Sequence, residues 1–482
     1  MKQPFFVILF LLSSIAMFGQ SSNNKTMSKY ELQWKEVENF ENKDLPKSAL
    51  NVVETILQQS VAENNAQQAI KALIHRNKFK AEIDSEENKG IFTDLENLLT
   101  KTNDTAEKSL LHSMLAELYI NYYQTNRWVI DQRTELDSYI PEDMDEWTAN
   151  IFLHKAVSHF NQSVENKTEL LKAKTETYGD IILIGEDSDE FYPTLYDFLM
   201  KRILDIYNYP NSDKFNKALS KNQISLNDLA QGTQEFIKLN LGTATYDNAL
   251  LKLFYIQQYI VSLSDRKLLE TLVLTEISRL NYLNKMSSRF SENYYLKSLV
   301  NLYENYKSNP ISIEIIAEIV DYYQNGSRNY PSFFIPQNKE TTENTKQAYE
   351  WCKKGIESYP EYKRTYILKA KLEDIERPFA GITRSEIFSP DEQDKILILE
   401  YKNINRITID ILKETSDDKF VPTDKMEIDL SPKTTYLSEK KEIKLNLKEL
   451  GKYKLRYSFD KETDSKNEVL TYITKLAVLA GL

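Results

Sequence analysis

The segment 366–412 contains the change of hydrophobic pattern that decides the fold. It reads YILKAKLEDIE at 366–376, RPFAGITRSEIFSP at 377–390, KILILEYK at 395–402 and RITIDIL at 406–412. Apolar residues have helical spacing up to Glu376, and after Pro390 they alternate with polar residues at a period of two. Pro378 and Gly381 stand between the two patterns and break a helix. The sequence therefore predicts helices before this segment and strands after it.

Helical periodicity extends over residues 27–376. One predicted face comprises Leu45, Ala49, Val52, Val53, Ile56 and Leu57, and another comprises Leu111, Leu115, Leu118, Tyr119 and Tyr122. Turn signals such as Asn64-Asn65 and Tyr359-Pro360 recur every 15 to 25 residues. This spacing is typical of helical hairpins rather than of βαβ units.

Some of these hairpins resemble tetratricopeptide repeats, in which small residues allow two helices to approach closely. The spacing of that motif is matched by Ala348, Cys352, Gly355 and Pro360, and more weakly by Ala49, Val53 and Ile56. No strict 34-residue period is found, so the prediction is a long irregular α-solenoid. A non-repetitive helical domain is the alternative.

Alternating apolar residues predict a C-terminal antiparallel β-sandwich over residues 390–482. The alternating sets are Ile407, Ile409 and Ile411; Met426, Ile428 and Leu430; Ile443, Leu445 and Leu447; and Tyr453, Leu455 and Tyr457. Each set is bounded by Asn, Asp, Pro, Ser or Gly, as half-buried strands are. The predicted fold class is therefore α+β.

Composition excludes several classes of protein. The chain has 482 residues with 28% charged and 41% hydrophobic residues, which disfavours disorder and a bundle of membrane helices. Only 11 Gly and 13 Pro disfavour collagen-like and all-β classes. The net charge of −11 argues against nucleic-acid partners, which require a basic surface.

Residues 1–20 are predicted to be a signal peptide. Lys2 precedes an uncharged run from Phe5 to Phe18, which is too short to span a bilayer comfortably. No later apolar run reaches about 18 residues, so no integral membrane span is expected in the mature chain. The expected location is the periplasm or cell envelope. The single cysteine, Cys352, permits no intramolecular disulfide and is interpreted as a small buried side chain.

Four sets of segments carry a resemblance to a known family. They are Tyr30–Trp34 with Leu45–Leu50; Leu115–Tyr119 with Tyr122, Asn126–Trp128 and Asp131–Thr134; Gly185–Ser188 with Tyr192–Leu199; and Glu400–Asn403. On these segments the chain resembles the N-terminal region of the alpha-2-macroglobulin-like proteins exported by Bacteroidetes-type bacteria. The resemblance implies a helical region followed by a first macroglobulin-like domain.

The resemblance does not carry over the family's trapping chemistry. Family members are normally several times longer, and their later domains hold a bait segment and, in many, a Cys-Gly-Glu-Gln thioester. Cys352 stands in Trp-Cys-Lys-Lys instead. The chain ends about where the family's chain would pass into its next sandwich, so truncation before the bait and thioester domains is expected.

Motifs for catalysis and metal binding are weak. His154 and His159 are five residues apart, which places them off a common helical face, so a zinc pair is disfavoured. The acidic run Glu186–Glu190 could hold a hard cation but is better explained as a solvated turn before a helix. Arg127, Trp128 and Arg133 could form a cation–π contact or a structural corner.

The predicted function is that of an exported, non-enzymatic interaction or scaffold module with a protein partner, either a protease or an envelope protein. No catalytic, cofactor-binding or metal-ligating residue is assigned. One alternative is an N-terminal fragment of a full-length macroglobulin-like protease inhibitor. Another is an enzyme with an unrecognised carboxylate site, which would require a concave pocket with two perturbed acids.

Overall fold

A computed structural model describes most of the chain in two compact units. The described residues are 28–83, 90–134, 140–208, 212–241, 249–328, 339–382, 387–391, 394–416, 419–460 and 467–473. The expected signal peptide, 1–20, and the residues 474–482 of the expected sandwich lie outside them. The first unit ends at Tyr295 and the second begins at Leu296. The α+β class predicted from the sequence is confirmed, with helices first and largely antiparallel sheets near the C-terminus.

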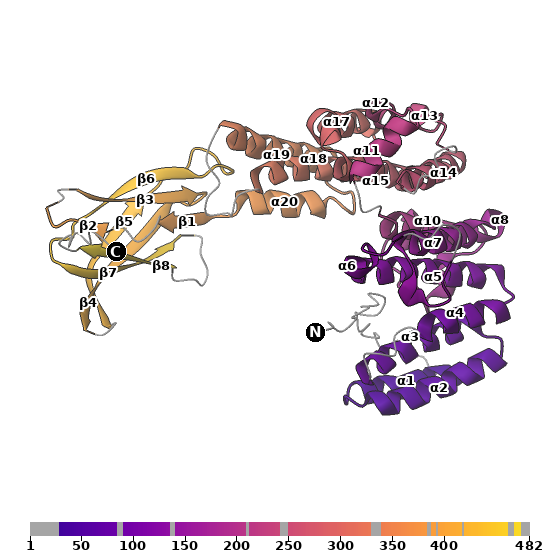
Figure 1. Ribbon diagram of the computed structural model, residues 1–482. Helices are drawn as coiled ribbons and strands as arrows, with labels where there is room; N and C mark the ends of the chain where they lie inside the picture. Colours follow the sequence, from indigo (N-terminus) through magenta and orange to yellow (C-terminus); the bar gives the residue numbers. More distant parts are fainter. Residues whose placement is uncertain are drawn as a thin grey trace. The chain divides into compact units, whose positions relative to one another are not determined.

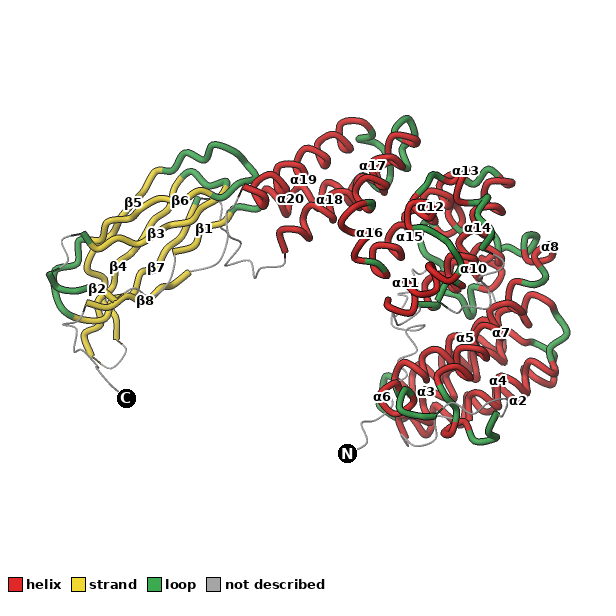
Figure 2. Tube along the Cα trace, turned by 45° about the horizontal axis from the view of Figure 1, so that its top comes forward, coloured by secondary structure: helices red, strands yellow, loops and turns green. Residues whose placement is uncertain are grey.

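The first unit is helical (Figures 1 and 2). Its helices are α1 Lys29–Glu41, α2 Pro46–Ala62, α3 Ala66–Ile83, α4 Gly90–Lys101, α5 Thr105–Thr125, α6 Arg127–Ile130, α7 Ala149–Val164, α8 Lys167–Leu170, α9 Ser188–Phe191, α10 Leu195–Ile206, α11 Ser212–Lys221, α12 Leu226–Ala230, α13 Thr233–Phe236, α14 Leu251–Arg266, α15 Leu269–Met286 and α16 Ser288–Asn293. Short 3₁₀ turns lie at Met144–Glu146 and Thr175–Tyr178. Helices close in sequence pack in pairs, such as α2 with α3 and α14 with α15.

The buried face of α2 agrees with the predicted pattern. Ala49, Val53, Ile56 and Leu57 are buried, and Pro46 occupies the first turn, where its missing N–H costs nothing. Leu45 is 44% exposed, contrary to the expectation, because it precedes the helix as its N-cap residue.

Helix α5 is more buried than its predicted stripe implies. Leu111, Leu115 and Tyr119 are buried as expected, but Ile120 and Tyr123 on other faces are buried too. The cause is that α5 packs against α4, α7 and α10 at the same time. A helix that is apolar on most sides is the one that the others surround.

The second unit begins with further helices. They are α17 Tyr295–Tyr306, α18 Ser312–Arg328, α19 Lys339–Ser358 and α20 Tyr366–Glu376. Ala348 and Cys352 of α19 are fully buried. A Cβ atom on Gly355 would lie 2.3 Å from Leu368 Cδ1 and 3.1 Å from Ile316 Cδ1, so these helices approach closely only because residue 355 is glycine. The small residues expected from the repeat motif therefore lie at a helix contact.

Two sheets follow the helices. Their strands are β1 Phe379–Ile382, β2 Ile387–Phe388, β3 Lys395–Lys402, β4 Arg406–Ser416, β5 Lys419–Asp429, β6 Glu439–Leu445, β7 Gly451–Phe459 and β8 Asn467–Ile473. One sheet has the order β1-β3-β6 and the other β2-β8-β7-β4-β5. All pairs are antiparallel except β2 with β8, which is parallel and only two residues long, so the fully antiparallel expectation was wrong there. Strand structure begins at Phe379, earlier than the predicted boundary at Pro390. The sequence did not reveal β1 and β2 because each is too short to show a period of two.

Side chains from both sheets form one apolar core. On β3, Leu397, Leu399 and Tyr401 are buried while Ile398 is exposed, and β7 alternates in the same way. The core cluster includes Ile407, Ile409 and Ile411 of β4. The period-two pattern thus marks strands with one buried face.

The end of α20 is tied to the strands. Lys402 Nζ donates to the carbonyl of Ile375 at 2.7 Å, and Asn403 Nδ2 donates to that of Glu376 at 2.8 Å. Tyr349 of α19 stacks on Tyr436 with ring centroids 4.5 Å apart. Secondary structure changes from helix to strand after Glu376, within the second unit. The boundary between the two compact units is a different one and lies between Tyr295 and Leu296.

Candidate functional site

Cys352 has the properties of a packed side chain. It lies fully buried in α19, and burial raises the pKa of its thiol to about 12. A thiol of that pKa holds almost no nucleophilic thiolate at neutral pH. The sequence interpretation of Cys352 as a small buried side chain agrees with this position.

The histidines combine differently from the pair considered in the sequence. His154 is exposed, and His159 of α7 instead faces His112 of α5, with their Nδ1 atoms 2.9 Å apart. The ring centroids are 5.1 Å apart, about the separation of two rings whose Nδ1 atoms point at each other. The two nitrogens therefore share one hydrogen, and the sequence could not find this pair because its members lie on different helices.

The acidic run lies where the sequence placed it, at the start of a short helix. Asp187 is the N-cap residue of α9, and Asp189 and Glu190 lie in its first turn. In the described part of the chain no group of three or more His, Cys, Asp or Glu side chains is arranged to hold a metal ion.

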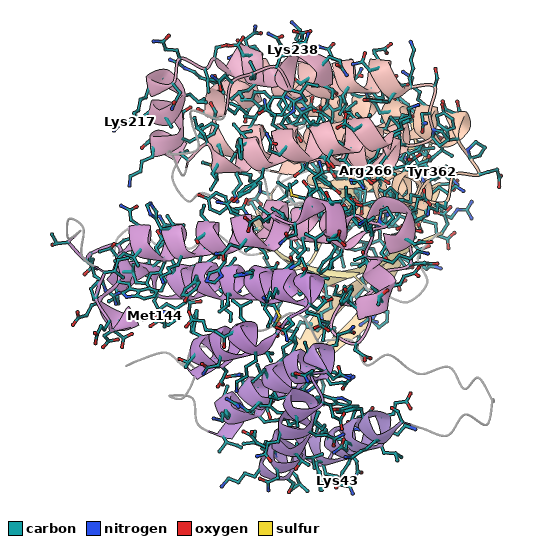
Figure 3. All side chains as sticks on the ribbon, turned by 90° about the vertical axis from the view of Figure 1, so that its right-hand side faces the viewer. Lys43, Met144, Lys217, Lys238, Arg266 and Tyr362 are labelled. Atoms are coloured by element: carbon teal, nitrogen blue, oxygen red, sulfur yellow. The ribbon has the colours of Figure 1, made fainter. Side chains whose placement is uncertain are left out.

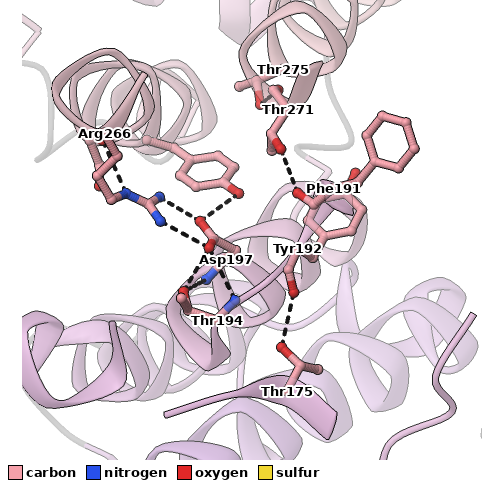
Figure 4. Close-up of polar contacts among 10 residues, drawn as sticks. Thr175, Phe191, Tyr192, Thr194, Asp197, Arg266, Thr271 and Thr275 are labelled. Carbon is pink, nitrogen blue, oxygen red and sulfur yellow. Dashed lines mark hydrogen bonds and ion pairs between the residues drawn. The ribbon is translucent and has the colours of Figure 1, made fainter. Parts of the chain in front are cut away.

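The segment Tyr192–Leu199 surrounds a buried charge. Asp197 of α10 is fully buried and accepts hydrogen bonds from Arg266 Nη1 at 3.0 Å and Nη2 at 2.5 Å (Figure 4). It also accepts from the hydroxyls of Thr194 at 2.6 Å and Tyr259 at 3.1 Å. Every lone-pair direction of the carboxylate is thus occupied. Because Arg266 and Tyr259 belong to α14, their hydrogen bonds to Asp197 connect α10 to α14.

The corner at Arg127–Arg133 is held by polar contacts that leave its tryptophan outside. Arg127 Nε donates to Asp131 at 2.9 Å, Tyr123 donates to the same carboxylate at 3.0 Å, and Arg133 Nη1 donates to the carbonyl of Trp147 at 2.5 Å. The structural corner considered in the sequence analysis therefore describes both arginines better than a cation–π contact with Trp128.

Trp128 is the feature of this corner that the sequence did not reveal. Its side chain is 86% exposed, and the following Val129 is 61% exposed. A tryptophan buries a large apolar area when it is covered, and tryptophan is enriched among the residues that dominate binding at protein interfaces. We define the corner surface as Arg127, Trp128 and Val129.

A pocket adjoins the corner surface at Arg127. It has a volume of about 410 Å³ and is lined by residues from five helices and the end of α10: Ile120, Tyr123, Gln124, Arg127, Leu153, Asn208, Ser212, Lys285 and Met286. The described lining residues include two cations and no carboxylate. Because these residues are far apart in the sequence, no local motif could have predicted the pocket.

Comparison with known proteins gives no match to any protein-family model and none to a curated protein. Among the described helices, none combines the length and the apolar character needed to cross a membrane.

Proposed function

We propose that this chain is an exported, non-catalytic protein-binding module. Its architecture is that of an irregular α-solenoid followed by one macroglobulin-like β-sandwich, resembling the N-terminal part of bacterial alpha-2-macroglobulin-like proteins. Pairwise packing of successive helices supports the solenoid, and the single apolar core between two sheets supports the sandwich. The Lys2 and Phe5–Phe18 pattern supports export.

The exposed Trp128 is the observation that carries the binding role. Interfaces are enriched in Trp and Arg, which supply most of the binding free energy where they are covered. Trp128 and Arg127 are adjacent here, and Asp131 holds the arginine in place. A short helix that follows directly on the buried α5 presents both side chains, so the backbone that carries them is already ordered before a partner binds.

Co-purification from the exported fraction of the native cells tests this role. We expect a discrete protein to be recovered with the wild-type chain and to be reduced about tenfold or more by Trp128→Ala, since hot-spot tryptophans contribute that much. Leu183→Ala is the matched control, because Leu183 is also a large apolar side chain with 70% exposure. Equal recovery with wild type and Trp128→Ala would contradict the proposal.

A further inference from the structure

The pocket beside the corner surface differs in charge from the rest of the chain. The whole chain has a net charge of −11, yet among the described residues two cations and no carboxylate line this pocket. The cations are Lys285 and Arg127, and Arg127 is paired with Asp131. Ile120, Leu153 and Met286 supply apolar walls. Gln124 and Ser212 add polar groups that can donate hydrogen bonds. An anionic group with an apolar body is the kind of ligand that such a lining complements.

A third cation lies behind the pocket. Lys252 is only 5% exposed, and its Nζ donates to Oδ1 of Asn208, a lining residue, at 2.9 Å. Nζ also lies 5.0 Å from the centre of the Tyr282 ring. Within the described residues, no carboxylate oxygen lies within ion-pair distance of this ammonium group.

Its surroundings make Lys252 costly to keep charged. Burial lowers the pKa of Lys252 to about 8; Asp205 opposes this effect, while Lys285 and Lys201 reinforce it. A buried cation without a carboxylate partner destabilises a fold unless an anion approaches it. Its position one residue behind the pocket wall means that an anion bound in the pocket would lessen that cost.

We infer that the pocket binds a carboxylate-bearing, partly apolar peptide segment of the partner, held by Lys285 and Arg127 and packed against Ile120, Leu153 and Met286. This inference rests on the proposed protein-binding role. The carboxylate comes from an acidic side chain or from a chain end. Both sources present the same chemistry to the two cations.

Fluorescence anisotropy with a rhodamine-labelled peptide of alternating leucine and glutamate tests the inference on the full chain. We expect binding that weakens about tenfold when glutamine replaces glutamate, and about tenfold in Lys285→Gln, as for the loss of one charge-assisted hydrogen bond. Lys238→Gln is the control for charge, because Lys238 lies on the outer surface (Figure 3) and is absent from the pocket. Preference for the free-acid peptide over its amide would identify a chain end, and equal binding would identify side-chain carboxylates.

Lys252→Met separates binding from folding. It removes a buried charge while keeping an unbranched side chain, so we expect weaker peptide binding together with an unchanged or higher free energy of unfolding. Equal affinity of the glutamate and glutamine peptides when both have amidated ends, together with no preference for the free-acid peptide, would overturn the inference. Equal effects of Lys285→Gln and Lys238→Gln would overturn it as well. A partner whose recovery depends on Trp128 but not on Lys285 would overturn the inference and leave the proposed function intact.

Discussion

At the scale of single residues, Asp197 is a buried charge that joins two helices of the first unit. It accepts hydrogen bonds from Arg266, Tyr259 and Thr194 while fully buried. Removing one partner of a buried ion pair leaves the other charge without compensation. The role of Asp197 is therefore to attach α10 to α14.

Asp197→Asn should lower the free energy of unfolding by about 3 kcal/mol, since a buried pair loses its charge complement. Urea unfolding followed by circular dichroism measures this value. Glu169→Gln is the control, because Glu169 pairs with Lys172 at the surface. That surface pair should contribute no more than about 0.5 kcal/mol. Equal effects of the two substitutions would contradict the account of Asp197.

The histidine pair predicts how stability depends on pH. Burial, then His112 and Lys155, lower the pKa of His159 to about 4. Burial also lowers the pKa of His112; Glu165 opposes this effect and Lys108 adds to it. An unfolded histidine has a pKa of about 6.5, so between these values the unfolded chain binds more protons. Stability is therefore present above about pH 6.5 and falls as the pH falls toward 4.

His159→Gln should reduce this loss of stability between pH 7 and pH 5. The free energy of unfolding, measured in urea at several pH values, should depend less steeply on pH in the variant. The difference in slope should correspond to about one proton fewer taken up on unfolding. His154→Gln is the control, because His154 lies on the same helix with an exposed side chain. A slope unchanged by His159→Gln would show that the pair is protonated in the folded state as well.

At the scale of elements, Asn403 joins a helix to a strand. Its φ of 54° lies in the left-handed region, and its side chain donates to the last carbonyl of α20. Asparagine tolerates this conformation better than most residues. The side chain thus acts as a C-terminal cap supplied from outside the helix.

Substitutions of Asn403 should therefore follow an order. Asn403→Gly keeps the backbone conformation and should cost about 1 kcal/mol for the lost hydrogen bond. Asn403→Asp places a negative charge at a helix C-terminus, and Asn403→Ala adds backbone strain, so each should cost about 2 kcal/mol. Thermal unfolding of the second unit measures the series. Three equal and negligible effects would exclude the capping role.

The elements also show how far the sequence predicts this structure. Strands β4 and β7 were predictable because each has one buried face, which imposes a period of two. The full burial of α5 was not, because it depends on which helices surround it. Asp197 lay within a segment that the sequence singled out, but its partner Arg266 is on another helix, so the ion pair was not visible in the sequence.

The binding features were the least predictable part. The sequence analysis considered Trp128 for a cation–π contact or a structural corner. Only the structure shows that its side chain is 86% exposed, and this exposure is what suggests a binding surface. Lys252 lies within an amphipathic pattern that gives no sign of its burial. A pocket formed by five helices is a property of tertiary packing, so its lining could not be read from local spacing.

At the scale of the whole molecule, both proposed binding features belong to the first of the two compact units. The two units each have their own apolar core, and the segments that carry the family resemblance include structural joints at Asp197 and Asn403. The corner surface and the cationic pocket lie in the first unit, and pocket residues such as Ile120 and Tyr123 also belong to its buried core. The central claim is that a protein partner covers this corner.

Site-specific photo-crosslinking tests that claim most directly. A p-benzoylphenylalanine in place of Val129, which leaves Trp128 intact, should, on irradiation in the native cells, produce one discrete crosslinked product with an exported protein. The same group in place of Leu183, which is also exposed, should not produce it. The same products from both positions, or none from position 129, would contradict the claim that the corner surface is where the chain binds its partner.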